Sequence, residues 1–290
     1  MTESTHAATT ADDGASAPSF AVGKVTLTVL DLRRVAAFYE TVVGLHALRA
    51  DGETRLLGAD DAPLLELRAD RSARRRSPQE AGLFHTAFLL PGRRDLARWL
   101  KRAIEDGTPL AGASDHAVSE ALYLSDPEGN GVEIYSDRTS DLWTWSNGAV
   151  AMSTERLDVE DLLRHAGDRR WERAPAGTTV GHVHLQAGAL DAAEAFYAGL
   201  LGLDVTCRYP GATFYAADGY HHHLATNVWN SRGAAPRSFP STGLAEVELR
   251  VSQERLASVR ASAPDAAVAD DGALALRDPW NTPVVLRPVG

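Results

Sequence analysis

Residues 82–137 begin and end with side chains that could bind a metal ion. His85 lies in an apolar segment at the start of this stretch, and Glu133 lies in another at its end. Imidazole nitrogens and carboxylate oxygens both bind divalent first-row metals, and a third ligand from elsewhere in the chain would leave positions open for chemistry. The pair therefore predicts a metal site, provided that the fold brings the two segments side by side.

The stretch that contains these two residues predicts one β-α-β-β-β unit. A strand over FHTAFLLP is followed by a helix over 94–104 and by strands that end at 132–135. The last strand follows DPEGNG, in which Asp-Pro starts a turn and the Gly and Asn residues tolerate a left-handed backbone. His85 and Glu133 thus fall on the first and last strands of one unit.

The same plan occurs four times in the chain. Segments 23–45 and 181–203 each predict an alternating strand, a short turn, a helix of period 3.6 with Ala-Phe-Tyr at the same offset, and a closing Gly-Leu. The C-terminal copy has a helix over 253–262 and a DPWNTP turn. Because one unit cannot bury the concave face of its own sheet, two must pack together. We predict an α+β protein of four βαβββ modules, paired into two eight-stranded, cup-like half-barrels.

These modules divide the chain into four parts. The first part consists of small and polar residues and lacks the apolar core of a signal peptide, so we expect a disordered tail. The third holds several tryptophans and a short helix over 159–165 and connects the two halves. The expected parts are the tail at 1–18, modules one and two at 19–137, the linker at 138–178, and modules three and four at 179–290.

Composition narrows the classes of partner and compartment. The 290 residues carry a net charge of −10, which argues against nucleic acid and anionic membrane as partners. A single cysteine, Cys207, allows no disulfide within the chain, which fits a reducing cytoplasm. No apolar run reaches the roughly 18 residues of a membrane span.

Four long segments resemble the vicinal-oxygen-chelate superfamily, which includes glyoxalases, bleomycin-resistance-type proteins and extradiol dioxygenases. They are FHTAFLLPGRRDLARWL, SDHAVSEALYLSDPEGNGVEIYSDR, VGHVHLQ and DGYHHHLATNVW. Over nearly the whole chain the sequence is similar to the four-module, catechol-2,3-dioxygenase-like members. That resemblance implies an extradiol dioxygenase of aromatic compound degradation, which inserts O₂ into a catechol-type diol at a mononuclear non-haem Fe(II) site, with Mn(II) as the alternative metal.

The resemblance also implies where the metal ligands lie, on the first and last strands of the modules. Aligned first strands place at one position Lys24, His85, His182 and Glu246; aligned last strands place Glu133 opposite Val285. Only modules two and three offer histidine at the ligand position. The expected metal ligands are His85, His182 and Glu133, which requires module two to pair with module three. Lys24 would form a salt bridge with Glu66 or Glu246 in a cup that binds no metal.

Further roles come from the same resemblance. In the His-His-x-Leu-Ala run, His222 is the expected acid/base, since an imidazole with pKa near 6.5 can take and return a proton near neutral pH. Tyr123 is expected to bond a substrate oxygen or orient a ligand, and His116 to line the distal side of the pocket, oriented by Asp115. The structural alternatives are a surface histidine tract for His222, a core aromatic residue for Tyr123 and a loop histidine for His116.

The remaining candidates are two histidines expected to contact substrate. His184 follows His182 on one strand face by period 2, and it could equally fill the barrel. His221 precedes His222 in a triplet that we place on the last strand of module three. On a strand, alternation would put His221 and His223 on the face opposite His222.

Two other functions fit the same fold. A glyoxalase-type metal-dependent isomerase would use two acidic ligands and no imidazole base, and a metal-free binding protein of the resistance type would have an apolar cup. The expected partners are a small aromatic diol, either a catechol or a hydroquinone, and O₂. Family habit and the exposed-looking Trp143 and Trp145 suggest a homo-oligomer.

Overall fold

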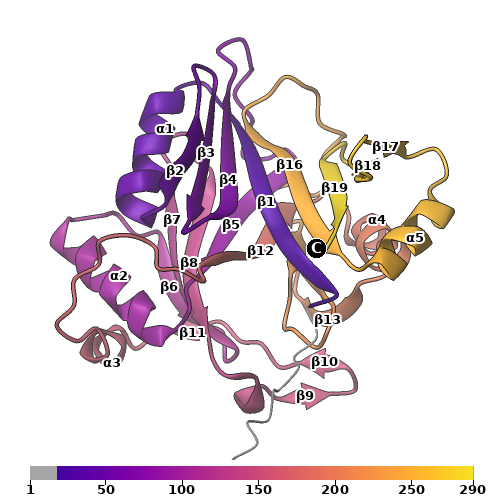
Figure 1. Cartoon of the computed structure of the whole chain (residues 1–290). Coiled ribbons are helices and arrows are strands. Elements are labelled where there is room, and N and C mark those ends of the chain that lie inside the picture. Colours follow the sequence, from indigo (N-terminus) through magenta and orange to yellow (C-terminus); the bar gives the residue numbers. More distant parts are fainter. Residues whose placement is uncertain (1–17, 290) are drawn as a thin grey trace, which may run out of the picture.

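A computed structural model describes residues 18–289 of the chain, so the tail expected at 1–18 lies almost wholly outside the described residues. The strands and helices follow the predicted modules (Figure 1). Module one contains β1 (Phe20–Val29), α1 (Leu32–Phe38), β2 (His46–Ala50), β3 (Thr54–Ala59) and β4 (Ala62–Ala69). Module two contains β5 (Gly82–Leu89), α2 (Arg93–Glu105), β6 (Gly112–Asp115), β7 (Ser119–Ser125) and β8 (Gly131–Asp137).

The second half of the chain repeats this order. Module three contains β12 (Thr179–Gln186), α4 (Leu190–Glu194), β13 (Asp204–Tyr209), β14 (Ala212–Ala216) and β15 (Leu224–Asn227). Module four contains β16 (Gly243–Val251), α5 (Gln253–Ser262), β17 (Ala267–Val268), β18 (Leu274–Arg277) and β19 (Pro283–Pro288). Between the halves lie a 3₁₀ turn (Ser140–Leu142), β9 (Trp145–Ser146), β10 (Ala149–Val150), β11 (Glu155–Arg156) and α3 (Val159–Arg164).

The modules pair as the ligand positions require. One sheet has the order β17-β18-β19-β16-β1-β4-β3-β2 and joins module four to module one. The other has the order β11-β6-β7-β8-β5-β12-β15-β14-β13 and joins module two to module three through the antiparallel pair β5–β12. The predicted α+β architecture of two half-barrels is confirmed. The segment expected as a linker also adds β11 as a ninth strand to the second sheet.

Apolar side chains on the convex faces of the sheets form the main core with the helices. In the second half of β1 every second residue is buried there, as shown by Val25, Leu27 and Val29. Helix α2 presents Leu96 and Trp99 to this core, and Trp99 Nε1 donates to the Val42 carbonyl at 2.8 Å. Burying each large apolar side chain contributes about 1.5–3 kcal/mol. Figure 1 shows α1 and α2 on one side of the molecule and α4 and α5 on the other.

The repeated tyrosines and aspartates pair between modules. Tyr39 and Tyr197 are buried in π-helical turns, Tyr39–Val43 and Ala195–Leu200, that continue the predicted helices. Tyr39 donates to Asp126 Oδ2 at 3.3 Å, and Tyr197 donates to Asp278 Oδ2 at 3.1 Å. The other oxygen of each aspartate accepts backbone N–H groups of its own Asp-Pro turn. In modules two and four, the turn before the last strand is therefore held by the preceding module.

Candidate metal centre

Strand register places the three expected ligands together on the concave face of the second sheet. Ala87 on β5 is opposite Glu133 on β8 and also opposite His182 on β12. His85 is two residues before Ala87, so the alternation of β5 points both side chains to the same face. The small, fully buried Ala87 leaves the space between the two flanking strands open for their longer side chains.

The ligand atoms of these residues converge. His85 Nε2 lies 2.9 Å and His182 Nε2 lies 3.1 Å from Glu133 Oε2, and all three side chains are buried. Each residue offers one ligand atom within 4.8 Å of the other two. Within residues 18–289 this is the group of three or more His, Cys, Asp or Glu residues that could hold a metal ion.

The hydrogen bonds of the site are incomplete in a way that a cation would complete. His85 Nε2 is buried and forms no hydrogen bond among the described residues, although it lies 2.9 Å from the Glu133 carboxylate. Unpaired polar atoms inside a protein are costly, at about 1–3 kcal/mol each. Two imidazole nitrogens and one carboxylate oxygen aimed at one point therefore fit a divalent metal ion.

Protonation states at the site also suit metal binding. Burial by itself raises the pKa of a carboxyl group, but the facing His182 and His85 imidazoles hold the pKa of Glu133 well below its ordinary value. Burial lowers the pKa of His182. Metal ligands must be deprotonated to bind. At neutral pH this carboxylate and this imidazole therefore bind a cation without first releasing a proton.

Gly131 allows the close approach of β8 to β5 that the site needs. A Cβ atom at this position would lie 2.0 Å from the Phe84 carbonyl oxygen and 3.1 Å from His85 Cβ. We expect Gly131→Ala to lower the free energy of unfolding by about 1–3 kcal/mol and to weaken metal binding, because β8 must move and Glu133 moves with it. Denaturant unfolding of the metal-free protein and metal titration measure both effects.

Gly112→Ala is the matched control for this substitution. Gly112 also lies in a strand of the second sheet, but an added Cβ would make only an ordinary 3.8 Å contact with the Tyr123 ring. If both variants unfold at the same denaturant concentration and bind metal equally, the close approach at Gly131 is not needed.

Tyr123 and His116 form a pair beside the centre. Tyr123 is opposite Glu133 in the β7–β8 pairing, and its ring centroid lies 5.7 Å from that of His85. His116 Nδ1 lies 2.7 Å from the Ser153 carbonyl, which can only accept, so this nitrogen carries the hydrogen and Nε2 accepts from the Tyr123 hydroxyl at 2.6 Å. Burial and the Glu133 carboxylate raise the pKa of Tyr123 well above its ordinary value.

Asp115 does not orient His116, contrary to the sequence-based expectation. Its carboxylate instead accepts from the Ala117 backbone N–H at 2.9 Å and from Arg138 at 2.5 Å. Short loops favour such local bonds, which compete with side-chain partners farther away. The Ser153 carbonyl, from the segment between the half-barrels, orients the His116 ring in its place.

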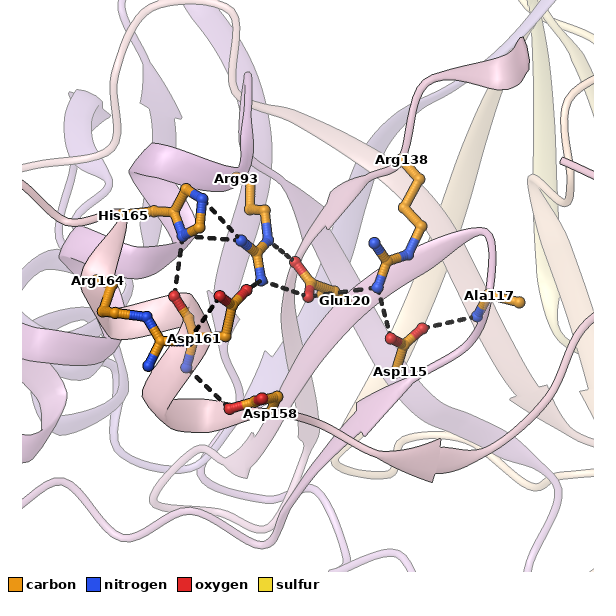
Figure 2. A network of polar contacts seen from close by, with 9 residues as sticks. All are labelled: Arg93, Asp115, Ala117, Glu120, Arg138, Asp158, Asp161, Arg164 and His165. Carbon is orange, nitrogen blue, oxygen red and sulfur yellow. Dashed lines mark hydrogen bonds and ion pairs between the residues drawn. The ribbon is translucent and has the colours of Figure 1, made fainter. Parts of the chain in front are cut away.

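A charged network ties the turn that carries His116 to the rest of module two (Figure 2). Glu120 is buried and accepts from Arg93 at 2.5 and 2.9 Å and from Arg138 at 3.4 Å. Arg93 also donates to Asp161 of α3 at 2.7 Å. Bonds to several partners restrict each side chain more than an isolated surface ion pair does. The network therefore links α3 and α2 to the β6–β7 turn.

The histidine triplet lies just before β15 rather than on it. Asp218 and Gly219, with positive φ values of 58° and 71°, form a turn after β14, and the strand β15 begins only at Leu224. His222 lines the cavity, with its ring centroid 4.1 Å from that of His182. His221 is fully buried behind His222 and does not line the cavity, because its Nε2 turns to Asp137 at 2.8 Å.

His184 lines the cavity as expected of a substrate contact. Its Nε2 lies 3.0 Å from Asn227 Nδ2, which donates, and its ring packs against Phe84, Phe214 and Trp229. Burial, with the charges of the neighbouring His85 and His182 rings, lowers the pKa of His184 well below its ordinary value. A neutral imidazole with aromatic neighbours is suited to contact a flat ring.

The cavity over the centre has a volume of about 560 Å³. This lies within the range of small-molecule sites, roughly 300–1,000 Å³. Sequence reasoning did not find several of its wall residues, which are Phe84, Met152, Ser153, Phe214 and Trp229. Phe84 and Phe214 are on predicted strands, where an aromatic residue has no signal that separates a cavity wall from a core. Met152 and Ser153 come from the segment expected to be a linker.

In the first sheet, a salt bridge lies at the position that the metal ligands have in the second sheet, as predicted. Lys24 donates to Glu66, and Arg68 donates to the other oxygen of that carboxylate at 2.6 Å. These ion pairs lie where the second sheet has its histidines and glutamate, since Thr26 on β1 is opposite Glu66 on β4.

Of the two tryptophans expected at an interface, Trp145 is exposed, whereas Trp143 is half-buried against Tyr220 and His221. No helix of the described residues is both long and apolar enough to span a membrane.

Known proteins are similar to this chain in sequence and in fold. Residues 21–134 match the model of the glyoxalase/bleomycin resistance protein/dioxygenase superfamily. A protein named catechol-2,3-dioxygenase from Bacillus subtilis (strain 168) is 41% identical over 235 residues, which are 77% of this chain and 80% of that protein. The chain therefore belongs to the glyoxalase/bleomycin resistance protein/dioxygenase superfamily.

Solved structures agree at the level of the fold. A putative dioxygenase from Bacillus subtilis subsp. subtilis str. 168 has a TM-score of 0.66 at 14% identity, covering 94% of this chain and 86% of that chain. Glyoxalase I from Zea mays has a TM-score of 0.56 at 15% identity, covering 92% of each chain. Since one fold hosts several chemistries, the site must decide between them.

Proposed function

We propose that the protein is an extradiol ring-cleaving dioxygenase that binds one Fe(II) per chain and inserts O₂ into a catechol-type diol. The observation that carries the proposal is the convergence of His85, His182 and Glu133, with the His85 Nε2 atom buried and without a hydrogen-bond partner in the described part of the chain. Two histidines and one carboxylate with open positions are typical of non-haem Fe(II) oxygenases. The 41% identical relative named catechol-2,3-dioxygenase supports the same assignment.

Iron bound to these residues would acidify the diol hydroxyls that coordinate it and pass electrons from the diol, which is the reductant, to O₂. The chain's own residues then have defined tasks. His184 and Phe214 pack against each other and line the cavity, where they bound the space for the ring. The Tyr123 hydroxyl, which donates to His116, keeps its oxygen lone pairs free to accept from a substrate hydroxyl.

His222 is the acid/base of the proposed reaction. Burial, with the charges of neighbouring histidines, lowers the pKa of His222 well below its ordinary value, so the ring is neutral at neutral pH and one of its nitrogens has a free lone pair. Its ring lies against His182 and Phe214 and borders the cavity. It is therefore placed to take a proton from the diol and to return one as the ring opens.

Two observations favour this reaction over a glyoxalase-type isomerisation. The converging set contains one carboxylate and two imidazoles rather than two acidic ligands. A further imidazole, His222, borders the same cavity. In a metal-free binding protein, the buried His85 Nε2 would stay without a hydrogen-bond partner among the described residues, which is energetically unfavourable.

The test is anaerobic loading with Fe(II), followed by a panel of substituted catechols and hydroquinones in air. We expect one iron per chain, oxygen uptake and a yellow ring-fission product. Protein verified to hold iron that consumes no oxygen with any diol would contradict the assignment. Turnover of a hemithioacetal by the same preparation would favour the isomerase instead.

A further inference from the structure

A series of hydrogen-bonded side chains leads from the half-buried Asp137, at the end of β8, to His222. Asp137 Oδ1 lies 2.8 Å from His221 Nε2, and His221 Nδ1 lies 2.8 Å from His222 Nδ1. His221 is fully buried, whereas His222 reaches the cavity. Two imidazoles in series thus connect a carboxylate to the space above the candidate metal centre.

Hydrogen-bond chemistry determines which atom donates at each contact in this series of side chains. A carboxylate only accepts, so His221 Nε2 carries a hydrogen, and in the neutral ring His221 Nδ1 has a lone pair. His222 Nδ1 must then be the donor across the 2.8 Å contact. The neutral His222 ring is left with a lone pair on Nε2, and Nε2 forms no hydrogen bond within residues 18–289.

Aromatic neighbours hold Asp137 and His221 in place. Tyr220 donates to the other carboxylate oxygen, Asp137 Oδ2, at 3.0 Å, and the Tyr220 and Tyr135 oxygens lie 2.9 Å apart. Trp143 packs edge-on against the His221 ring at a centroid distance of 5.0 Å. Because both oxygens of Asp137 are bonded, a rotation that released His221 would also break the bond to Tyr220.

We propose that Asp137 and His221 are positioning residues that hold His222 in its Nδ1–H tautomer, with the Nε2 lone pair available to the substrate. This inference rests on the proposed function, in which His222 accepts a proton. Neither residue touches substrate; both act through His222. In serine proteases, loss of the carboxylate that orients an imidazole gives the wrong tautomer and lowers turnover about 10⁴-fold. Through a second imidazole we expect a smaller loss, of about 10- to 100-fold.

The first test reads the tautomer directly, without turnover. Histidine ¹⁵N signals are recorded on the full chain loaded with Zn(II), a diamagnetic ion that the same ligand set accepts. The His222 signals are assigned by their loss in His222→Gln. We expect wild type to show the Nδ1–H form alone. Asp137→Asn offers both a donor and an acceptor to His221, so the Nε2–H form of His222 should become populated.

Matched variants separate positioning from folding. Asp137→Glu keeps an acceptor-only group at this half-buried position and should restore the Nδ1–H form. Tyr220→Phe removes a hydrogen bond from the same carboxylate without offering a donor, so the tautomer should be kept. In the iron-loaded protein, Asp137→Asn should lower kcat by about 10- to 100-fold with KM changed less than about threefold.

Each result decides one assignment. Wild type with His222 in the Nε2–H form would overturn the proposal even if no variant folds. An unchanged tautomer and kcat in folded Asp137→Asn would overturn it too. If the tautomers respond as expected but iron-loaded wild type cleaves no diol, the proton arrangement stands and the proposed function fails.

Discussion

Replacing His182 with alanine is expected to abolish retention of Fe(II), and with it diol cleavage. The His182 Nε2 atom is one of two imidazole nitrogens that face Glu133 Oε2, and its removal leaves one imidazole and one carboxylate. Loss of a residue that merely supports a metal ligand already weakens binding about 10–100-fold. Loss of a ligand itself should weaken it by more than about 100-fold.

Iron content after anaerobic loading and desalting measures this effect, together with oxygen uptake on addition of a catechol. His184→Gln is the matched control, because His184 is equally buried two residues farther along β12 but is bonded to Asn227 and not to Glu133. The control should keep its iron. If His182→Ala retains one iron per chain, His182 is not a ligand and the site must be assigned again.

His222→Gln should have the second large effect, with a different signature. Iron content should stay at one per chain, because His222 contacts His182 but is not part of the converging set. The value of kcat should fall by about 10²- to 10⁴-fold, since glutamine cannot exchange a proton with the substrate. The KM should change little, because the walls of the cavity remain.

His223→Gln is the matched control for this prediction. His223 packs against Phe20 and Tyr220 and does not line the cavity; burial lowers its pKa to about 3. Steady-state oxygen uptake at saturating diol compares the two variants. If His222→Gln turns over as fast as His223→Gln, the proton must be moved by another group.

Local patterns in the sequence were sufficient for the modules and for the ligand types. Alternation identified the first strands, and the repeated plan of the modules placed α2 and α5 within one residue of their observed ends. The paired Asp-Pro turns marked the last strand of modules two and four. Such features depend on residues close in sequence, so each segment carries its own signal. Aligned repeats then put His85 and His182 at equivalent positions.

The same local reasoning failed where a distant contact or a bend decided the outcome. Alternation assumed that the triplet 221–223 continues a strand, but strand pairing begins only at Leu224. Asp115 was expected to serve His116, yet Arg138 holds its carboxylate. The π-helical turns at 39–43 and 195–200 were not predicted either, and each contains a tyrosine that donates to an aspartate of another module.

The amino-acid sequence by itself determined four repeated modules and which of them carry imidazole and carboxylate groups at the ligand positions. Only the tertiary structure decided that these groups converge, that residues 152–154 wall the cavity, and that Asp137 and His221 stand behind His222. The reason is physical. Strand pairing between modules two and three joins segments about a hundred residues apart, and their contacts depend on register and burial across the whole sheet rather than on neighbours in the chain.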